Sequence, residues 1–170
     1  IRKIHRHGIS VNAGFIFGMD HDTTDSINRR FDYMLRSIID SFQTTILTPL
    51  PGTALFERFV KEKRLLFTDF PNDWKYYDYA EPVIQPKNMT PEELYGTMKK
   101  NFIRLYNRNS VRKRLRRSLF NIRRFEPAWW GYVTNYNYYC MAFENEIRSV
   151  DPRYSHGLVS EKAAGKPPKH

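Results

Sequence analysis

The sequence predicts an α/β fold: two parallel strands with their helices, which fit a segment of a (β/α) barrel or of an open α/β sheet, followed by a mainly helical extension. Two short apolar strand patterns, near residues 9–17 and 43–48, alternate with two helical patterns. Helices of this length can carry the chain back across a sheet, so the order indicates a right-handed βαβ unit. Because two strands cannot close a barrel, we expect the chain to supply only part of the sheet.

The first predicted elements are a helix end and a strand. Residues 1–8 resemble the last turns of a helix closed by Gly8, with no initiator Met before them, so we expect the chain to begin inside a larger protein. The segment Ile9–Phe17 is rich in β-branched and aromatic residues and is apolar on both faces toward its end. This composition predicts a buried strand that ends at Gly18.

A helix over about residues 24–39 and a second strand come next. The helix should lie against the sheet, because its apolar residues recur at helical spacing. They are Ile27, Phe31, Met34, Leu35, Ile38 and Ile39. The strand Gln43–Thr48 then ends at Pro-Leu-Pro-Gly-Thr, residues 49–53, which cannot continue a strand ladder. Another helix follows, to about Arg64.

The chain divides into three predicted parts. Residues 1–66 hold the strands and helices of the barrel, residues 67–150 form the helical extension, and residues 151–170 form a frayed tail. Residues 68–89 should be ordered, because their many aromatic side chains need burial. The segment Thr90-Pro-Glu-Glu93 predicts a helix start, with Thr90 as the cap and glutamate three residues later.

Composition excludes several classes of protein. With 41% hydrophobic residues the chain has material for a core. No apolar run approaches the roughly 20 residues of a membrane span and no charged-then-apolar leader opens the sequence, so we expect a cytoplasmic location. The single cysteine, Cys140, excludes a disulfide framework and any cluster held by several thiolates of this chain. We expect Cys140 to be a small buried residue.

The net charge of +10 is concentrated in one segment. Between Lys99 and Arg124 there are eleven Lys or Arg and no Asp or Glu. A helix predicted over residues 111–124 is apolar on one side and basic on the other, which suits nucleic acid or an anionic membrane surface. It equally suits a solvated face, or packing against an acidic neighbour. An aromatic helix over about residues 127–148 is expected next.

Two segments at the predicted strand ends are candidates for a ligand site. Ligands bind at the C-terminal ends of strands in parallel α/β folds, and Gly14 and Gly18 lie at such an end. Glycine lets a ligand approach the backbone closely, but it also simply forms turns. Residues 49–53 end the next strand in the same sense, so both segments should lie side by side on one rim. By physics alone, the proline segment is a pocket floor or a structural turn.

Longer motifs resemble a known family. Residues 8–26 read Gly-Ile-x-Val-x-x-Gly-Phe-Ile-Phe-Gly-Met-Asp-x-Asp-Thr-x-Asp-Ser, and residues 47–53 read Leu-Thr-Pro-Leu-Pro-Gly-Thr. Together they resemble the later strands of the radical S-adenosylmethionine (SAM) barrel, most closely in enzymes with an N-terminal cobalamin-binding domain. Residues 74–78 and 86–94 are similar to the extension that follows the barrel in that group. The resemblance covers roughly residues 8–106.

This resemblance implies roles for the strand-end residues. The residues implied to bind SAM, or to border it and the substrate, are Gly14, Phe15, Ile16, Gly18, Thr48 and Pro49. Those implied to line the substrate pocket are Asp20, Leu50, Pro51, Gly52 and Thr53. The acid usual after the glycine strand is Asp20 or Asp22, and Asp22 is also a candidate helix cap.

The resemblance also implies cofactors and partners. Family members cleave SAM with a [4Fe-4S] cluster held by three clustered cysteines, which this chain lacks. The chain would therefore be a C-terminal fragment, not competent alone, of an enzyme for methylation or carbon-skeleton rearrangement. SAM, the cluster and, for the cobalamin-binding members, cobalamin are the implied cofactors. The implied partners are an N-terminal barrel half, a cobalamin-binding domain and a reductant protein.

Overall fold

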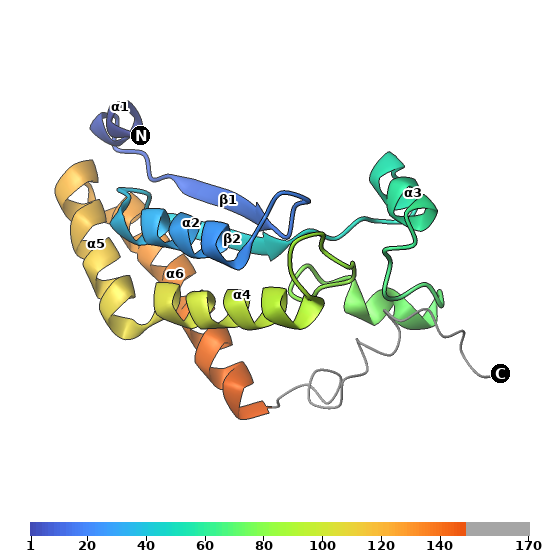
Figure 1. Cartoon of the computed structure of the whole chain (residues 1–170). Coiled ribbons are helices and arrows are strands. Elements are labelled where there is room, and N and C mark those ends of the chain that lie inside the picture. The colour runs from blue at the N-terminus through green and yellow to red at the C-terminus, as the bar shows by residue number, and fades with distance from the viewer. Residues whose placement is uncertain (149–170) are drawn as a thin grey trace. The chain divides into compact units, whose positions relative to one another are not determined.

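The computed structural model describes the backbone of residues 1–148 and the side chains of residues 1–140. The predicted tail, residues 151–170, lies outside the described residues. Figure 1 shows the elements along the chain, and the predicted succession of strand, helix, strand and helix is confirmed. They are α1 (Arg2–Arg6), β1 (Asn12–Phe17), α2 (Thr24–Arg36), β2 (Ser41–Ile46), α3 (Ala54–Lys61), the 3-10 helix η1 (Asn72–Tyr76), α4 (Pro91–Tyr106), α5 (Arg108–Ile122) and α6 (Phe125–Arg148).

Strands β1 and β2 pair in a two-stranded sheet. The amide of Ser41 donates to the carbonyl of Val11 at 3.2 Å, and the amide of Leu47 donates to the carbonyl of Phe17 at 2.8 Å. The two strands therefore run in the same direction, and the predicted parallel pair is confirmed. Helix α2 connects them (Figure 1), as a parallel connection requires. A closed barrel is not seen, since the described chain has only these two strands.

The chain forms two compact units that interleave along the sequence. Among the described residues, the first unit contains 1–15, 25–44 and 98–148, and the second contains 16–24 and 45–97. Neither unit coincides with the predicted 1–66 segment, because distant stretches of the chain contribute to both.

The first unit has an apolar core that contains a buried polar network. Ile27, Phe31 and Met34 of α2 are fully or nearly fully buried, as their spacing predicted. The guanidinium of Arg114 is buried over the ring of Phe42, 5.0 Å from its centroid. Burial lowers the pKa of Arg114 to about 10, since a charged group is costly to desolvate.

The core of the second unit joins α3 to the segment after it. Leu47, Phe59 and Ile84 belong to one cluster of buried residues. Leu65 and Ile84 form an isolated antiparallel bridge. The Tyr77 hydroxyl donates to the Phe67 carbonyl at 2.7 Å, and burial, with the nearby Asp73 charge, raises the pKa of Tyr77 to about 12. Order in residues 68–89 is confirmed, although one of their aromatics, Trp74, is half exposed.

Two helix boundaries have visible causes. Helix α2 ends earlier than predicted, because the Ser37 hydroxyl donates to the Met34 carbonyl and accepts from the Ile39 amide. The predicted start of α4 is confirmed: Glu93 accepts from the Thr90 amide at 2.8 Å, and the Thr90 hydroxyl accepts from the Glu93 amide at 3.1 Å. Among the described residues, no helix has the length and apolar content to cross a membrane.

The prediction that the first strand is buried on both faces is wrong for this chain. Asn12, Gly14 and Ile16 point to one face of β1 and are exposed, whereas Phe17 on the other face is fully buried. The described residues cover only one side of the strand. The strand also begins later than expected, at Asn12.

Candidate site at the strand ends

The two segments predicted to share a rim do lie together. The hydrogen bond from the Leu47 amide to the Phe17 carbonyl, 2.8 Å long, is the last rung between the strands. It places Gly18, which follows β1, beside Leu47, which follows β2 and precedes Thr48. The observation that would have overturned the predicted arrangement, strand tips at opposite ends of the sheet, is not found.

Gly18 has a conformational reason to be glycine. Its φ is +89°, a left-handed value that side chains disfavour, and an added Cβ would lie 2.9 Å from Cδ2 of Leu94. The buried Asp22 carboxylate fixes this turn by accepting from the amides of Gly18 and Met19 at 2.9 and 3.0 Å. The geometry of the turn is therefore enough to explain why residue 18 is glycine.

Gly14 has no such reason. It lies in the middle of β1 and not at the strand's C-terminal end as predicted, because the strand continues to Phe17. It has no positive φ, and an added Cβ would meet no atom within 4 Å in the described chain. By the register of the sheet, Gly14 shares the exposed face of β1 with Ile16, and Gln43 of β2 is exposed on the same face. The backbone at Gly14 is thus open to a molecule approaching this face. Phe15 points to the other face, where its ring lies 6.0 Å from that of Phe42.

Asp20 lies in the loop after β1 and is surrounded by cations. Its carboxylate oxygens are 2.9 Å from Arg58, 2.8 Å from Arg64 and 3.6 Å from Lys87. Partial burial raises the pKa of Asp20, but the Arg64 hydrogen bond and the three positive charges outweigh it and hold this pKa below the usual value. Asp20 therefore joins the loop to α3 and to the 87–88 segment, where Asn88 donates to its carbonyl.

The segment from Thr48 to Thr53 forms a stiff turn into α3. The Thr48 hydroxyl donates to the Ile46 carbonyl at 3.1 Å, and Pro49 is buried. Gly52 has a φ of +85°, and Thr53 caps α3 by accepting from the Phe56 amide at 3.2 Å. Of the residues predicted to line a substrate pocket, Leu50 is exposed, Pro51 is half-buried, and Gly52 and Thr53 have structural roles of their own.

A metal site is not found in the part of the chain that the structure describes, where no three His, Cys, Asp or Glu side chains gather. Cys140 is half-buried rather than fully buried as expected. The imidazole of His21 is exposed and 3.9 Å from the Asp22 carboxylate. Ligands for an iron–sulfur cluster are therefore not offered by these residues.

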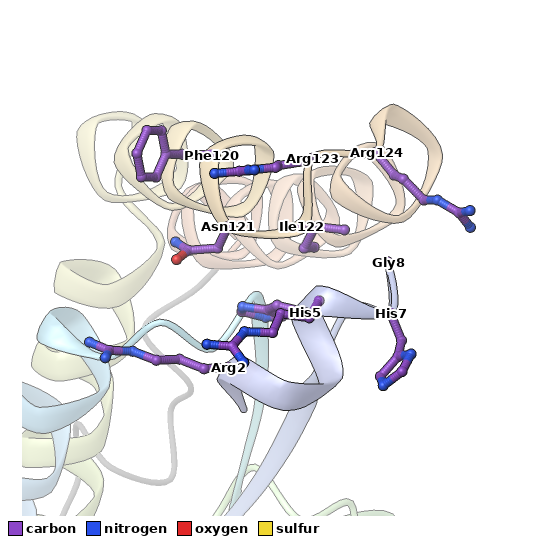
Figure 2. Close-up of a pocket in the computed structure, with 10 residues that line it drawn as sticks. Arg2, His5, His7, Gly8, Phe120, Asn121, Ile122, Arg123 and Arg124 are labelled. Carbon is purple, nitrogen blue, oxygen red and sulfur yellow. The ribbon is translucent and has the colours of Figure 1, made fainter.

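Sequence reasoning missed a basic pocket in the first unit (Figure 2). It has a volume of about 700 Å³ and lies between α1 and the end of α5. Its lining residues are Arg2, His5, Arg6, His7, Gly8, Phe120, Asn121, Ile122, Arg123 and Arg124. Local spacing could not reveal it, because the two stretches are over a hundred residues apart. Gly8 has a φ of +73°, which side chains disfavour, and an added Cβ would lie 2.4 Å from Cδ of Arg124 unless that side chain moved.

Comparison with known proteins finds methyltransferases and a cyclase among the relatives of this chain. The chain is 30% identical over 140 residues to a bacteriochlorophyllide d C-12(1)-methyltransferase of Chlorobaculum tepidum, covering 80% of this chain and 27% of that enzyme. It is 25% identical over 111 residues to an anaerobic magnesium-protoporphyrin IX monomethyl ester cyclase of Cereibacter sphaeroides, covering 65% and 17%. It is 33% identical over 69 residues to a hopanoid C-2 methylase of Rhodopseudomonas palustris, covering 41% and 13%.

The chain is a relative of these enzymes. It spans about a quarter or less of their length. No family model matches the chain, and no solved structure matches it. Two of the three relatives named above transfer a methyl group by name, which agrees with the class of reaction that the sequence motifs imply.

Proposed function

We propose that this chain supplies two late strands of a radical SAM barrel in a methyl-transferring enzyme, and with them part of the pocket for SAM and substrate. The relation to methyltransferases and a cyclase supports the class of enzyme. The adjacent strand ends support the place of the pocket, because ligands of parallel α/β folds bind there.

One observation carries the proposal. Gly14 is a strand glycine without a left-handed φ or a close neighbour, so neither turn geometry nor packing within the described chain accounts for it. Glycine weakens a strand, and close approach of another molecule or backbone is one of the reasons for which a strand contains glycine. The exposed face that Gly14 shares with Ile16 fits a flat group laid along the strand.

The described residues fit SAM but not its cluster. Gly14, Phe15, Ile16 and Gly18 would provide backbone contacts along the cofactor, and Thr48 and Pro49 would border it. SAM and a [4Fe-4S] cluster, when bound, supply the radical and the methyl group for such reactions. The cluster ligands would have to lie outside these residues, since three ligating side chains do not gather among them. Cobalamin is a further cofactor that the proposal admits.

The partners follow from this division of roles. An N-terminal barrel half with clustered cysteines, a cobalamin-binding domain and a reductant protein would complete the enzyme. The exposed face of β1 supports the first of these partners. Strands of parallel sheets are normally covered on both faces, and the described residues cover β1 on one face only. The chain alone would be inactive.

The test compares two glycines in the longer protein that contains this segment, after anaerobic reconstitution of its cluster. Gly14→Val should raise the Kd for SAM by about tenfold or more, equivalent to about 1.4 kcal/mol, because the side chain occupies the cofactor's place. Gly96→Ala on α4 is the matched control, since its added Cβ also meets no atom within 4 Å. Equilibrium dialysis with labelled SAM measures the binding, and iron content checks the cluster.

Two outcomes would count against the proposal. If Gly14→Val bound SAM as tightly as the unaltered protein, Gly14 would not lie at the cofactor. If the reconstituted longer protein held no iron–sulfur cluster and bound no SAM, the assignment to a radical SAM enzyme would be wrong.

A further inference from the structure

Helix α6 carries a row of stacked aromatic side chains. Its members, here called the aromatic ladder, are Phe125, Trp129, Tyr132, Tyr136 and Tyr139. Neighbouring rings lie 5.1 to 6.1 Å apart, and the planes of three of the four pairs are within 28° of parallel. The ladder is exposed at Phe125 (61%), Trp129 (46%) and Tyr136 (47%). Large aromatic side chains rarely gather on a surface without a partner.

A row of basic side chains on α5 lies beside this ladder. Arg108, Arg112 and Arg116 recur every four residues, so they project from one face of α5, and all three are exposed. The guanidinium of Arg108 donates to the Tyr139 hydroxyl at 2.8 Å. Because α5 and α6 form an antiparallel pair joined by a tight turn at residues 123–124, the basic row continues along the ladder from this contact.

The turn between the two helices extends the surface. Phe120 follows Arg116 on α5 and is 78% exposed. It also lines the basic pocket, together with Arg2, Arg6 and Arg124 (Figure 2). A second exposed stripe on α6 holds Trp130 (52%) and Val133 (39%). Exposed apolar groups and cationic groups are thus interleaved over both helices of the hairpin.

We propose that the α5–α6 hairpin docks the protein on the surface of an anionic phospholipid bilayer. Aromatic side chains with a polar atom favour the membrane interface, and basic side chains favour anionic headgroups. Between Lys99 and Cys140 the sequence has one acidic residue, Glu126, so little opposes this attraction. The basic pocket provides positive side chains for lipid phosphates, and Phe120, Trp129 and Trp130 enter the headgroup region.

The stacking favours lipid over single-stranded nucleic acid. Bases bind proteins by stacking on free aromatic faces. In the ladder those faces are already covered by the next ring along the helix, for example between Phe125 and Trp129, whose planes are 17° apart. The ladder therefore presents ring edges and hydroxyl groups, which suit an interface of headgroups and acyl chains.

The purified 170-residue chain is tested by flotation with phosphatidylcholine vesicles, with and without about 30% phosphatidylglycerol. Binding should require the anionic lipid and should fall steeply as salt rises, since the Debye length shortens. Arg112→Gln with Arg116→Gln should weaken binding about 25-fold at low salt, because each basic side chain near such a surface contributes about fivefold. Lys61→Gln with Lys63→Gln, which are exposed in the second unit, should change it little.

The contribution of the aromatic side chains is tested with a variant and a matched control variant of its own. Trp129→Ser with Trp130→Ser should weaken vesicle binding by about tenfold or more, as apolar area stays in water. Trp74→Ser, which removes a tryptophan exposed by 49% in the second unit, should not. In the Trp74→Phe variant, the fluorescence of Trp129 and Trp130 should shift to shorter wavelength on anionic vesicles. Circular dichroism confirms that each variant is folded.

Several results would overturn the proposal. They are no binding of the folded chain to anionic vesicles, equal binding to neutral vesicles at all salt concentrations, or no fluorescence shift on binding. Tighter binding to RNA or DNA than to vesicles would assign the surface to nucleic acid instead. Because the test uses no SAM and no cluster, its failure leaves the proposed enzyme function untouched.

Discussion

Replacing Asp40 by alanine should destabilise the first unit more than any exposed substitution. Asp40 immediately precedes β2, and its carboxylate is fully buried. One oxygen accepts from Nε2 of His5 at 2.8 Å and from the Val11 amide at 2.7 Å, and the other accepts from the Ser118 hydroxyl at 2.5 Å. The carboxylate thus joins α1, the entry to β1 and α5.

The expected cost follows from these three donors. Asp40→Ala leaves all three donors without an acceptor, those of His5 and Ser118 buried and that of Val11 part-buried. Each unsatisfied buried group costs about 1 to 3 kcal/mol. Local relaxation and water entry reduce the sum, so the expected loss in unfolding free energy is about 3 to 5 kcal/mol. Ser118→Ala removes only one donor and should cost about 1 kcal/mol. The value for Asp40→Ala is a large part of the stability of an ordinary domain, about 5 to 15 kcal/mol.

Urea unfolding followed by circular dichroism measures the loss. Asp78→Ala is the control: its exposed carboxylate accepts only from the Ala80 amide among the described contacts, at 3.0 Å, and its loss should be under about 0.5 kcal/mol. If Asp40→Ala cost less than about 1 kcal/mol, the buried network would not hold these elements together, and the reasoning from unsatisfied donors would be wrong.

Three further substitutions test other parts of the structure. The folded-state pKa of Asp20 is lowered, so its ion pairs stabilise above the unfolded value of 3.8 and are lost as pH falls through the lowered pKa. Asp20→Asn should therefore cost up to about 1 kcal/mol at pH 7 and nothing in strong acid, as urea unfolding at several pH values would show. Tyr106→Phe removes the buried hydroxyl that donates to the Phe42 carbonyl at 2.7 Å, and should cost about 1 kcal/mol by the same assay. Thr90→Ala should lower stability by about 1 kcal/mol in thermal unfolding followed by circular dichroism, whereas Thr90→Ser should not, because serine keeps the cap.

Elements with a local signal could be predicted from the sequence. The spacing of Ile27, Phe31 and Met34 identified the buried face of α2, and the residues from Thr90 to Glu93 identified the start of α4. The pairing of the two strands followed from their order and the helix between them. In each case, the residues that interact are within a few positions of one another, or the chirality of the connection leaves one arrangement.

The buried network around Asp40 could not be predicted, because its members are far apart in the sequence. Asn135 donates to the Asp40 carbonyl at 2.7 Å across 95 residues, and Ser118 is 78 residues away. His5, in the last turn of α1, is buried in this network. Polar residues at such separations carry no periodicity, and only the folded chain brings them together.

The roles of the two ends of the sheet can be separated by experiment. In parallel α/β folds, residues at the C-terminal strand ends act on ligands, and residues at the N-terminal ends stabilise the fold. Gly14 and Ile16 lie on the uncovered face of β1. The strand is nevertheless apolar, which is typical of strands that are covered on both faces. Asp40 lies just before β2, at the N-terminal end of that strand, and its carboxylate accepts three hydrogen bonds. Gly14→Val should therefore change SAM affinity in the longer protein without loss of stability, whereas Asp40→Ala should do the reverse wherever the protein stays folded. A variant pair that affected both properties equally would contradict this separation, and with it the place proposed for the cofactor.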